Sequence, residues 1–423
     1  MRIPKIAAAS AAVLLVAACG GGNGADDADS LTVWVMGTSE DALVEYFDGI
    51  EARFQEQHPG TGVDVEFIPW DDAQESITNA IAGGDAPDVL EVGNDQTANW
   101  AVQGALLEID DYVADWDEAA DMDQESLDYG AYEGVQYSVP WFSGVRTLYY
   151  RADWLDDLDA DVPKTWDDLV EVAKAVEEEQ NVPGFAAPTD FTNGIASFIW
   201  SNGGEIAVQD GGEWEGRLTD PATKEAIEFY ADLTVDEEIS PQAYVGETEL
   251  TPLADMANGR LGMYIDGGWA LSSMEEQADD PDILDDIEAA PIPGAEGTAP
   301  AFAGGSALAL FSTTETPDLA FDLLTTMADK EGGQEYADAA GFFPAYPELL
   351  DAPEYREDPF KAAAAEQMKN TSFFPATPNW NAADQDKKIL PSAVLEITRG
   401  TDVDQALEEA NDQLTETLNE PIE

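Results

Sequence analysis

The pattern of apolar positions over residues 31–92 switches between two periods. Residues 31–36 form an almost unbroken apolar run, which predicts a buried strand, and residues 63–67 and 88–92 predict two more strands. Between the first two strands, apolar residues recur at helical spacing, namely Tyr46, Phe47, Ile50 and Phe54. A further helix is predicted over 77–81. Strands that alternate with helices are typical of a parallel sheet with helices on both faces.

A second α/β region is predicted after Tyr150. Thr165 has an acidic residue, Asp168, three positions on, and this spacing indicates a helix N-terminus with Thr165 as the cap. Another helix is predicted over 221–234 and a strand over 261–265. The chain therefore holds at least two α/β regions, and its length suggests two or three domains.

The last apolar repeat runs almost to the end of the chain. Asp402 with Gln405 predicts a helix start, and the helical spacing then continues to Leu418. We expect this segment to dock on the body of the protein and not to form a free tail.

The first residues have the pattern of a secretory signal. Arg2 and Lys5 precede an apolar run over 7–18, which is too short to span a bilayer, and small residues lead to Cys19. Residues 16–19 resemble a bacterial lipobox, so we expect residues 1–18 to be a signal peptide and Cys19 to be lipidated. Residues 19–30 would then be a flexible, lipidated tether. The alternative is a secreted protein with an unmodified cysteine.

The chain is strongly acidic throughout its length. It has 89 acidic and 17 basic residues, for a net charge of −72, and the acidic positions are interleaved with apolar ones. A hydrophobic content of 44% is ample for a folded core. Such a charge repels nucleic acids and anionic lipid surfaces. An acidic surface that is poor in lysine also resembles adaptation to high salt, where screening weakens self-repulsion.

The sequence lacks the residues that several kinds of catalytic site require. The single cysteine and the single histidine, His58, exclude the usual zinc clusters, and no nucleophile elbow or phosphate-binding loop is present. We therefore expect no metal and no cofactor. A pair of carboxylates could still serve a glycosidase, and composition does not exclude this alternative.

Five segments, in order, resemble the family-1 extracellular solute-binding proteins, the substrate receptors of ATP-driven sugar importers. They are residues 140–155, 163–169, 202–206, 259–269 and 304–310. Within the first segment, Arg151 stands where the family pattern has Asn or Asp. The five segments extend over much of the mature chain.

This resemblance implies a periplasmic-binding-protein-like α/β fold with two lobes, each a sheet flanked by helices, and a ligand cleft between them. Crossing strands near residues 142–145, 289–301 and 343–350 would form the hinge. We expect lobe 1 to comprise 31–143 plus 302–345, and lobe 2 to comprise 144–301 plus 346–423.

The resemblance also implies aromatic side chains that stack on sugar rings. Trp269, which follows Gly267-Gly268, matches the family aromatic that lies against a sugar. Trp380 and its neighbour Asn381 lie where the family brings a C-terminal segment to the cleft. Trp141 and Phe142 could line the cleft at the first crossing, although a core role is equally expected.

Polar candidates follow the predicted strands. Asp95 comes after the third strand, at the carboxyl end where open α/β sheets bind ligands, and it matches a family position that accepts sugar hydroxyls. Ser39 and Glu40 come just after the first predicted strand, and the same argument supports them more weakly as ligand-binding residues. Further candidates are Asp266 as a hydroxyl acceptor and the backbone amides of Gly304 and Gly305.

The sequence thus predicts a receptor and not an enzyme. We expect a monomer, lipid-anchored on the extracellular face of the membrane, that binds a mono- or oligosaccharide and delivers it to the permease subunits of an ABC importer. Two alternatives stay open: a surface glycoside hydrolase or transferase, and a receptor for another polar solute.

Overall fold

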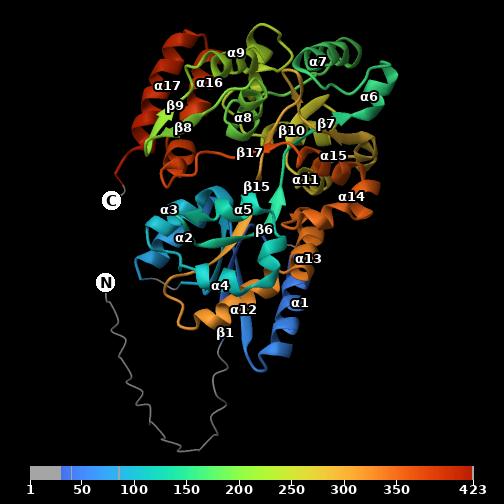
Figure 1. Ribbon diagram of the computed structural model, residues 1–423. Coiled ribbons are helices and arrows are strands. Elements are labelled where there is room, and N and C mark those ends of the chain that lie inside the picture. The colour runs from blue at the N-terminus through green and yellow to red at the C-terminus, as the bar shows by residue number, and fades with distance from the viewer. Residues whose placement is uncertain (1–29, 40, 84–85, 422–423) are drawn as a thin grey trace, which may run out of the picture.

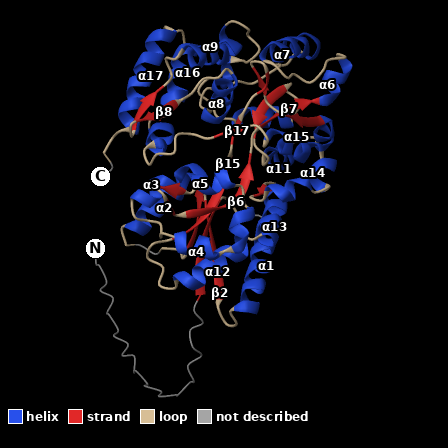
Figure 2. Cartoon of the chain, viewed as in Figure 1, coloured by secondary structure: helices blue, strands red, loops and turns tan. Residues whose placement is uncertain are grey.

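The structure is a computed structural model that describes residues 30–39, 41–83 and 86–421. Two α/β bodies lie one above the other in Figure 1 and are joined by the long strands β6 (Ser138–Gly144) and β15 (Gly304–Leu310). The lower body corresponds to the predicted lobe 1 and the upper body to lobe 2. Figure 2 shows helices around the strands of the lower body and helices flanking the strands of the upper body. The predicted two-lobed α/β fold is confirmed.

Lobe 1 is built on a six-stranded mixed sheet in the order β16-β6-β15-β3-β1-β2. Besides β6 and β15, its strands are β1 (Ser30–Met36), β2 (Gly62–Ile68), β3 (Val89–Gly93) and β16 (Phe343–Pro344). β1 pairs in parallel with β2 and β3, as predicted, whereas β15 is antiparallel to β3 and β6. β15 is antiparallel because it enters the sheet from lobe 2, at the end where β1 and β3 finish.

Both faces of this sheet are buried. Successive residues of β1 point to opposite faces, so Val33 and Val35 pack with α1 and α12, while Trp34 and Met36 pack on the other face, against α2 and α3. The helices of lobe 1 are α1 (Asp41–Gln57), α2 (Trp70–Ile81), α3 (Thr97–Val102), α4 (Asp110–Asp115), α5 (Gln124–Tyr129), α12 (Pro317–Ala328) and α13 (Lys330–Ala340). The apolar run of residues 31–36 is thus explained by burial on both sides.

Glu91 is an exception in this apolar sheet. It lies in β3, is 1% exposed, and accepts a hydrogen bond of 2.7 Å from the backbone amide of Met36. Burial raises the pKa of Glu91 to about 7, although hydrogen bonds from Ser306 and Met36 oppose the rise. Glu91 therefore holds the end of β1, and its proton is retained in the fold at pH values where an unfolded chain has released it.

We expect Glu91→Gln to stabilise the protein above neutral pH. The folded state binds this proton up to about pH 7, whereas the unfolded chain releases it near the ordinary glutamate pKa of 4.5, so stability is lost as pH rises through this window. The variant has no such loss, and its free energy of unfolding should exceed that of the parent by about 3 kcal/mol at pH 8. Near pH 4.5 the two should be equal. Urea unfolding at both pH values measures this, and a difference that does not change with pH would contradict it.

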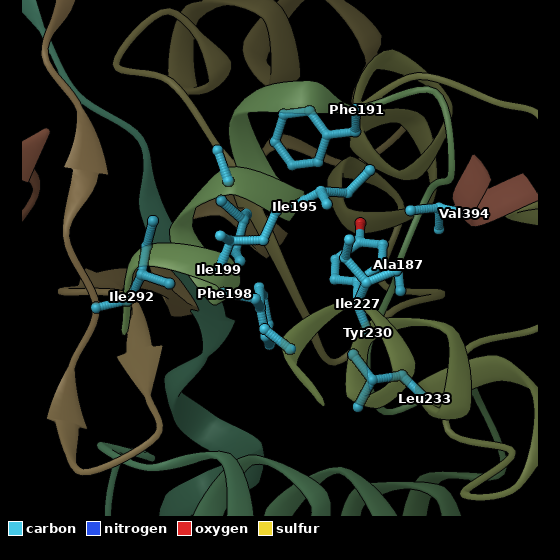
Figure 3. Close-up of a cluster of buried hydrophobic side chains, with 14 of the residues drawn as sticks. Ala187, Phe191, Ile195, Phe198, Ile199, Ile227, Tyr230, Leu233, Ile292 and Val394 are labelled. Carbon is cyan, nitrogen blue, oxygen red and sulfur yellow. The ribbon is translucent and has the colours of Figure 1, made fainter. Parts of the chain in front are cut away.

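Lobe 2 contains a three-stranded antiparallel sheet. β7 (Thr147–Arg151) lies between β10 (Met263–Asp266) and β11 (Ile287–Ala290). The surrounding helices are α6 (Ala152–Asp157), α7 (Trp166–Gln180), α8 (Thr192–Ser201), α9 (Pro221–Val235), α10 (Leu250–Ala257), α11 (Ala270–Gln277), α14 (Glu354–Glu357), α15 (Pro359–Gln367), α16 (Ile389–Thr398) and α17 (Val403–Leu418). The core lies mainly between the helices, and Figure 3 shows Phe198 of α8 beside Ile227 and Tyr230 of α9.

Two helix starts in lobe 2 were predicted from capping residues, and both are confirmed. Thr165 and Asp168 form a reciprocal capping box at the start of α7. The Asp402 carboxylate accepts a bond from the backbone amide of Gln405 at the start of α17. α17 packs against α16 and the short strand β9 (Glu213–Gly216) through Leu407 and other buried residues, so the end of the chain is docked, as expected.

The chain changes lobes at three places, and short strand pairs lie beside the main sheets. β6 of lobe 1 is followed by β7 of lobe 2, β15 re-enters lobe 1, and η5 (Pro347–Asp351) and α14 follow β16 into lobe 2. The short strands are β4 (Ala131–Tyr132), β5 (Val135–Gln136), β8 (Ala207–Asp210), β9 (Glu213–Gly216), β12 (Pro293–Gly294), β13 (Gly297–Thr298), β14 (Ala301–Phe302) and β17 (Thr371–Ser372). Because β14 still pairs with β17 of lobe 2, the second crossing falls between Phe302 and Gly304. This strand membership supports the lobe bounds, which we keep as a proposal.

None of the helices in the described part of the chain combines the length and the apolar character needed to cross a bilayer.

Candidate functional site

Asp95 marks the lobe 1 wall of the candidate site. It lies in the short 3-10 helix η1 (Asn94–Gln96), directly after β3, at the edge where β1 also ends. Burial raises the pKa of Asp95 to about 7, and the nearby carboxylate of Asp384 in lobe 2 adds to the rise. The backbone amide of Asp95 and the guanidinium of Arg146 act in the opposite direction. The predicted position at a strand end therefore brings Asp95 close to charged groups of the other lobe.

Arg146 is the central cation of the lobe 2 wall. It lies between β6 and β7, and its Nη2 donates to Oε1 of Glu249 at 2.8 Å, with both side chains more than four-fifths buried. Its Cζ is 5.0 Å from the ring centroid of Trp269 and 5.5 Å from that of Phe191. With its amide oxygen turned toward Arg146, Asn193 accepts from both terminal nitrogens at 3.2 and 3.0 Å. Arg146 is thus held in place by two aromatic rings, an amide and a carboxylate.

Asp266 is the last residue of β10, and Trp269 follows it after two glycines. Asp266 is completely buried, and its Oδ1 accepts a 2.7 Å bond from the amide of Gly267. Burial, followed by the charge of Glu249, raises the pKa of Asp266 to about 7. The ring of Trp269 covers Gly267, where a Cβ atom would lie only 2.1 Å from the ring. Glycine at this position is therefore what allows the ring to lie so close to the backbone.

The C-terminal segment brings another carboxylate to the site. Asp384 lies in the π-helical turn η6 (Ala382–Asp386), and its Oδ1 accepts a 2.5 Å bond from the hydroxyl of Thr192. Burial raises the pKa of Asp384, while its bonds from Thr192 and Gln385 lower it. Lys388 also acts on Asp384 but is ion-paired with Asp190 at 2.6 Å. A π-helical turn is common at functional sites.

Direct contacts join the two lobes beside these groups. The Asn381 amide donates to Oε1 of Gln74 in α2 at 3.0 Å, and the Tyr129 hydroxyl of α5 donates to the carbonyl of Phe374 at 3.3 Å. Burial, followed by the charge of the Asp95 carboxylate, raises the pKa of Tyr129. Asp95 and Asn381, predicted from sequence, therefore lie at or beside the boundary between the lobes.

The structure places three predicted aromatic residues in cores. Trp141 is completely buried, stacks on Tyr336 with centroids 3.8 Å apart, and donates to the Met327 carbonyl at 3.2 Å. Phe142 is 6% exposed in the same core. Trp380 is 2% exposed and packs on Phe374 in lobe 2, with centroids 4.8 Å apart. These rings are buried among other side chains and do not line the cleft.

The remaining predicted residues do not join the charged group. Gly304 and Gly305 pair with β6 at the crossing, and Gly305, at φ +129°, lies so close to Phe142 that a Cβ would be 2.2 Å from its carbonyl oxygen. Gly305 is therefore explained by the close approach of the two backbones, which leaves no room for a side chain. Ser39 is exposed beyond β1. Glu40 and Cys19 lie outside the described residues.

A cavity of about 680 Å³ lies elsewhere between the lobes. Its walls include Ser126 of α5, Val145 at the crossing, and Tyr355 and Met368 of lobe 2, and Gly304 is the one predicted site residue among them. We place the site at the charged group around Arg146 and not in this cavity. The charged group combines buried carboxylates, a fixed cation and a partly exposed tryptophan, which are the groups that recognise polar ligands.

Sequence reasoning missed Arg146, Phe191, Asn193, Glu249 and Asp384. Arg146 lies within the segment that resembles the family signature, at the predicted crossing between the lobes. Because burying a guanidinium is costly, an arginine at such a position could have been predicted to have a role in the site. Glu249 and Asp384 had no signal of their own among 89 acidic residues.

Comparisons with known proteins agree with this architecture. The family model for bacterial extracellular solute-binding proteins matches residues 37–334. The diacetylchitobiose-binding protein DasA of Streptomyces coelicolor is 29% identical over 393 residues, which cover 89% of this chain and 87% of that protein. An arabinooligosaccharide-binding protein of Halalkalibacterium halodurans is 24% identical over 353 residues, 79% of this chain and 76% of that protein.

Solved structures show the same fold. The GacH receptor of Streptomyces glaucescens superposes with a TM-score of 0.80 at 19% identity, over 93% of this chain and all of that one. The sugar-binding protein MalE of Xanthomonas citri gives a TM-score of 0.79 at 23% identity, over 92% of this chain and 97% of that one. The matched family model spans well over half of the sequence and confirms the resemblance seen in its segments. The chain therefore belongs to the bacterial extracellular solute-binding protein family.

Proposed function

We propose that this protein is an extracellular receptor that binds a mono- or oligosaccharide between its lobes and delivers it unchanged to an ABC importer. The observation that carries the proposal is the site itself: Asp95 of lobe 1 is close enough to Arg146 and Asp384 of lobe 2 for their charges to act on its pKa, and Arg146 lies over the ring of Trp269. Aromatic rings complement the apolar faces of sugars, and carboxylates and amides complement their hydroxyls. The sugar-binding relatives support the ligand class.

The hinge supplies a mechanism for binding. The crossing segments at β6, β15 and β16 are few, so the lobes can rotate about them, and a ligand that contacts both walls favours the closed arrangement. Asp95 would accept hydroxyls from lobe 1, while Trp269 would cover a ring face from lobe 2. Arg146 would donate to hydroxyl or ring oxygens while Glu249 and Asn193 hold it in place.

We further propose that lipid on Cys19 anchors the receptor on the outer face of the membrane, where the permease subunits are within reach of its tether. The pattern of residues 1–19 supports this proposal. We expect a monomer, and the acidic composition supports the hypothesis of a saline habitat.

The enzymatic alternative has one feature in its favour. Asp95 and Asp384 are carboxylates from opposite lobes with raised pKa values, and raised pKa values also occur in general acids. The relatives, however, are binding proteins. A receptor for a non-sugar polar solute is the other alternative.

A thermal-shift screen tests the function. The purified protein is heated with diacetylchitobiose, maltotriose, lactose and an arabinooligosaccharide, and each mixture is then checked for new products by mass spectrometry. We expect saturable stabilisation by at least one sugar, worth about 2.7 kcal/mol when the sugar is at 100 times its Kd, with the sugar recovered intact. Conversion of the sugar would support the hydrolase alternative. Stabilisation only by non-sugar solutes in the same screen would remove the sugar assignment.

A further inference from the structure

Trp70 differs from the other aromatic residues in its exposure. Of the aromatic residues in the described part of the chain, it is the most exposed, at 46%. Single exposed apolar residues are common on protein surfaces, so exposure alone assigns no role to Trp70. A tryptophan ring is nevertheless a large flat apolar surface, and its position in the fold decides what it can contact.

Trp70 lies at the edge of the lobe 1 sheet from which the chain crosses to lobe 2. β1 and β2 are parallel and stay paired to their last residues, Met36 and Ile68. Trp70 begins α2 two residues later. Because β3 is also parallel to β1, Trp70 follows β2 at the same edge at which Asp95 follows β3. β15 enters the sheet from lobe 2 at this edge, so Trp70 is on the side of lobe 1 where open α/β sheets bind ligands.

The helix that begins at Trp70 contacts lobe 2 directly. Gln74, four residues along α2, accepts the 3.0 Å bond from the side-chain amide of Asn381. Residues four apart on a helix are neighbours on one face, so Trp70 lies one turn from this interlobe bond. Asn381 immediately precedes the η6 turn that holds Asp384. A hydrogen bond between the lobes therefore places Trp70 beside the candidate site, on the lobe 1 side.

The core of lobe 1 does not account for this tryptophan. Ala73, Ile77 and Ala80 form the buried face of α2 and pack in one cluster with Trp34 of β1. Trp70 continues the same stripe by one turn toward the start of the helix, where the strands have already ended. It lies outside this cluster of described side chains, and nearly half of it stays accessible to a ligand.

On these grounds, and resting on the proposed sugar-binding function, we propose that Trp70 is a second stacking surface, on lobe 1, for a sugar ring beyond the one that lies on Trp269. The ligand is then an oligosaccharide and not a monosaccharide. Stacking on Trp70 adds apolar burial for the further ring without requiring particular hydroxyls, so affinity rises with chain length. Because the two tryptophans belong to opposite lobes, a chain that contacts both also favours the closed arrangement.

Three sugar series that differ only in length test this proposal. They are glucose, maltose and maltotriose; N-acetylglucosamine, diacetylchitobiose and triacetylchitotriose; and arabinose, arabinobiose and arabinotriose. Calorimetry gives the Kd of each sugar for the whole protein and for Trp70→Ala. In a series that binds, we expect the parent to bind the trisaccharide about tenfold or more tightly than the shortest member with a measurable Kd. Trp70→Ala should lose about tenfold in affinity for the trisaccharide and keep its affinity for that shortest member.

Two further variants show whether the ring itself causes the effect. Trp70→Tyr keeps an aromatic face and should recover most of the loss. Val235→Ala truncates another exposed apolar side chain, at the end of α9 and far from lobe 1 (Figure 1), and should leave every Kd unchanged.

The outcomes separate this inference from the receptor function on which it rests. Equal weakening of all lengths in Trp70→Ala would show a structural effect on the whole site and would overturn the inference. Parent-like binding of the trisaccharide by Trp70→Ala, or a parent that binds a monosaccharide at least as tightly as its trisaccharide, would overturn it while the receptor function stands. If no sugar of any series binds, both fall together.

Discussion

Replacement of Arg146 by alanine is expected to lower sugar affinity about 100-fold and the free energy of unfolding by about 3 kcal/mol. The guanidinium is held between the rings of Trp269 and Phe191 and is paired with a Glu249 side chain that is 17% exposed. Removal of one partner leaves the other charge buried and unpaired, which costs more than the pair itself contributes. It also frees the Trp269 ring from the cation that packs on it. Calorimetric titration and urea unfolding measure the two effects.

Two controls separate the role of the guanidinium from that of charge. Arg146→Lys keeps the charge but cannot bond to Glu249 and Asn193 through a planar fork, so it should retain most of the stability and lose about tenfold in affinity. Arg217→Ala removes an arginine that pairs with the exposed Glu215, and it should change stability by less than about 0.5 kcal/mol. Parent-like sugar binding by Arg146→Ala would remove Arg146 from the site.

Trp269→Ala is expected to weaken sugar binding about 10- to 100-fold, because loss of a stacked aromatic surface removes about 1.5–3 kcal/mol of apolar burial. The ring is partly exposed, and its position is fixed by close contact with Gly267 and by the guanidinium of Arg146. Trp269→Phe keeps a smaller flat surface and should recover most of the loss. The readout is the Kd for the sugar that gives the largest thermal shift in the parent. Equal Kd values for the parent and Trp269→Ala would show that no ring stacks there.

Much of the fold could be predicted because its determinants are local. The apolar run of residues 31–36 reflects burial on both faces of a central strand. The caps at Thr165 and Asp402 reflect bonds within four residues of each helix start. Strands β6, β15 and β16 join one sheet from three distant segments, and no local pattern shows that the sheet is mixed.

The candidate site was harder to predict for the same physical reason. Asp95 was predicted because the end of a parallel strand is a general binding position. The ring of Trp380 lies in a core and not in the cleft, and for Trp141 both places had stayed open, since a tryptophan has the same local pattern whether its ring faces a core or a cleft. Arg146 bonds to Glu249, and Asp384 to Thr192, only through tertiary contacts between segments more than 100 residues apart.

The central claim is that one sugar is held by both lobes at once, and a pair of affinities tests it most directly. The Kd for the same sugar is measured for Asp95→Ala in lobe 1 and Trp269→Ala in lobe 2, with circular dichroism to confirm that both are folded. We predict that each change alone weakens binding about tenfold or more. If either folded variant binds that sugar as tightly as the parent, the ligand does not span the two lobes at this site.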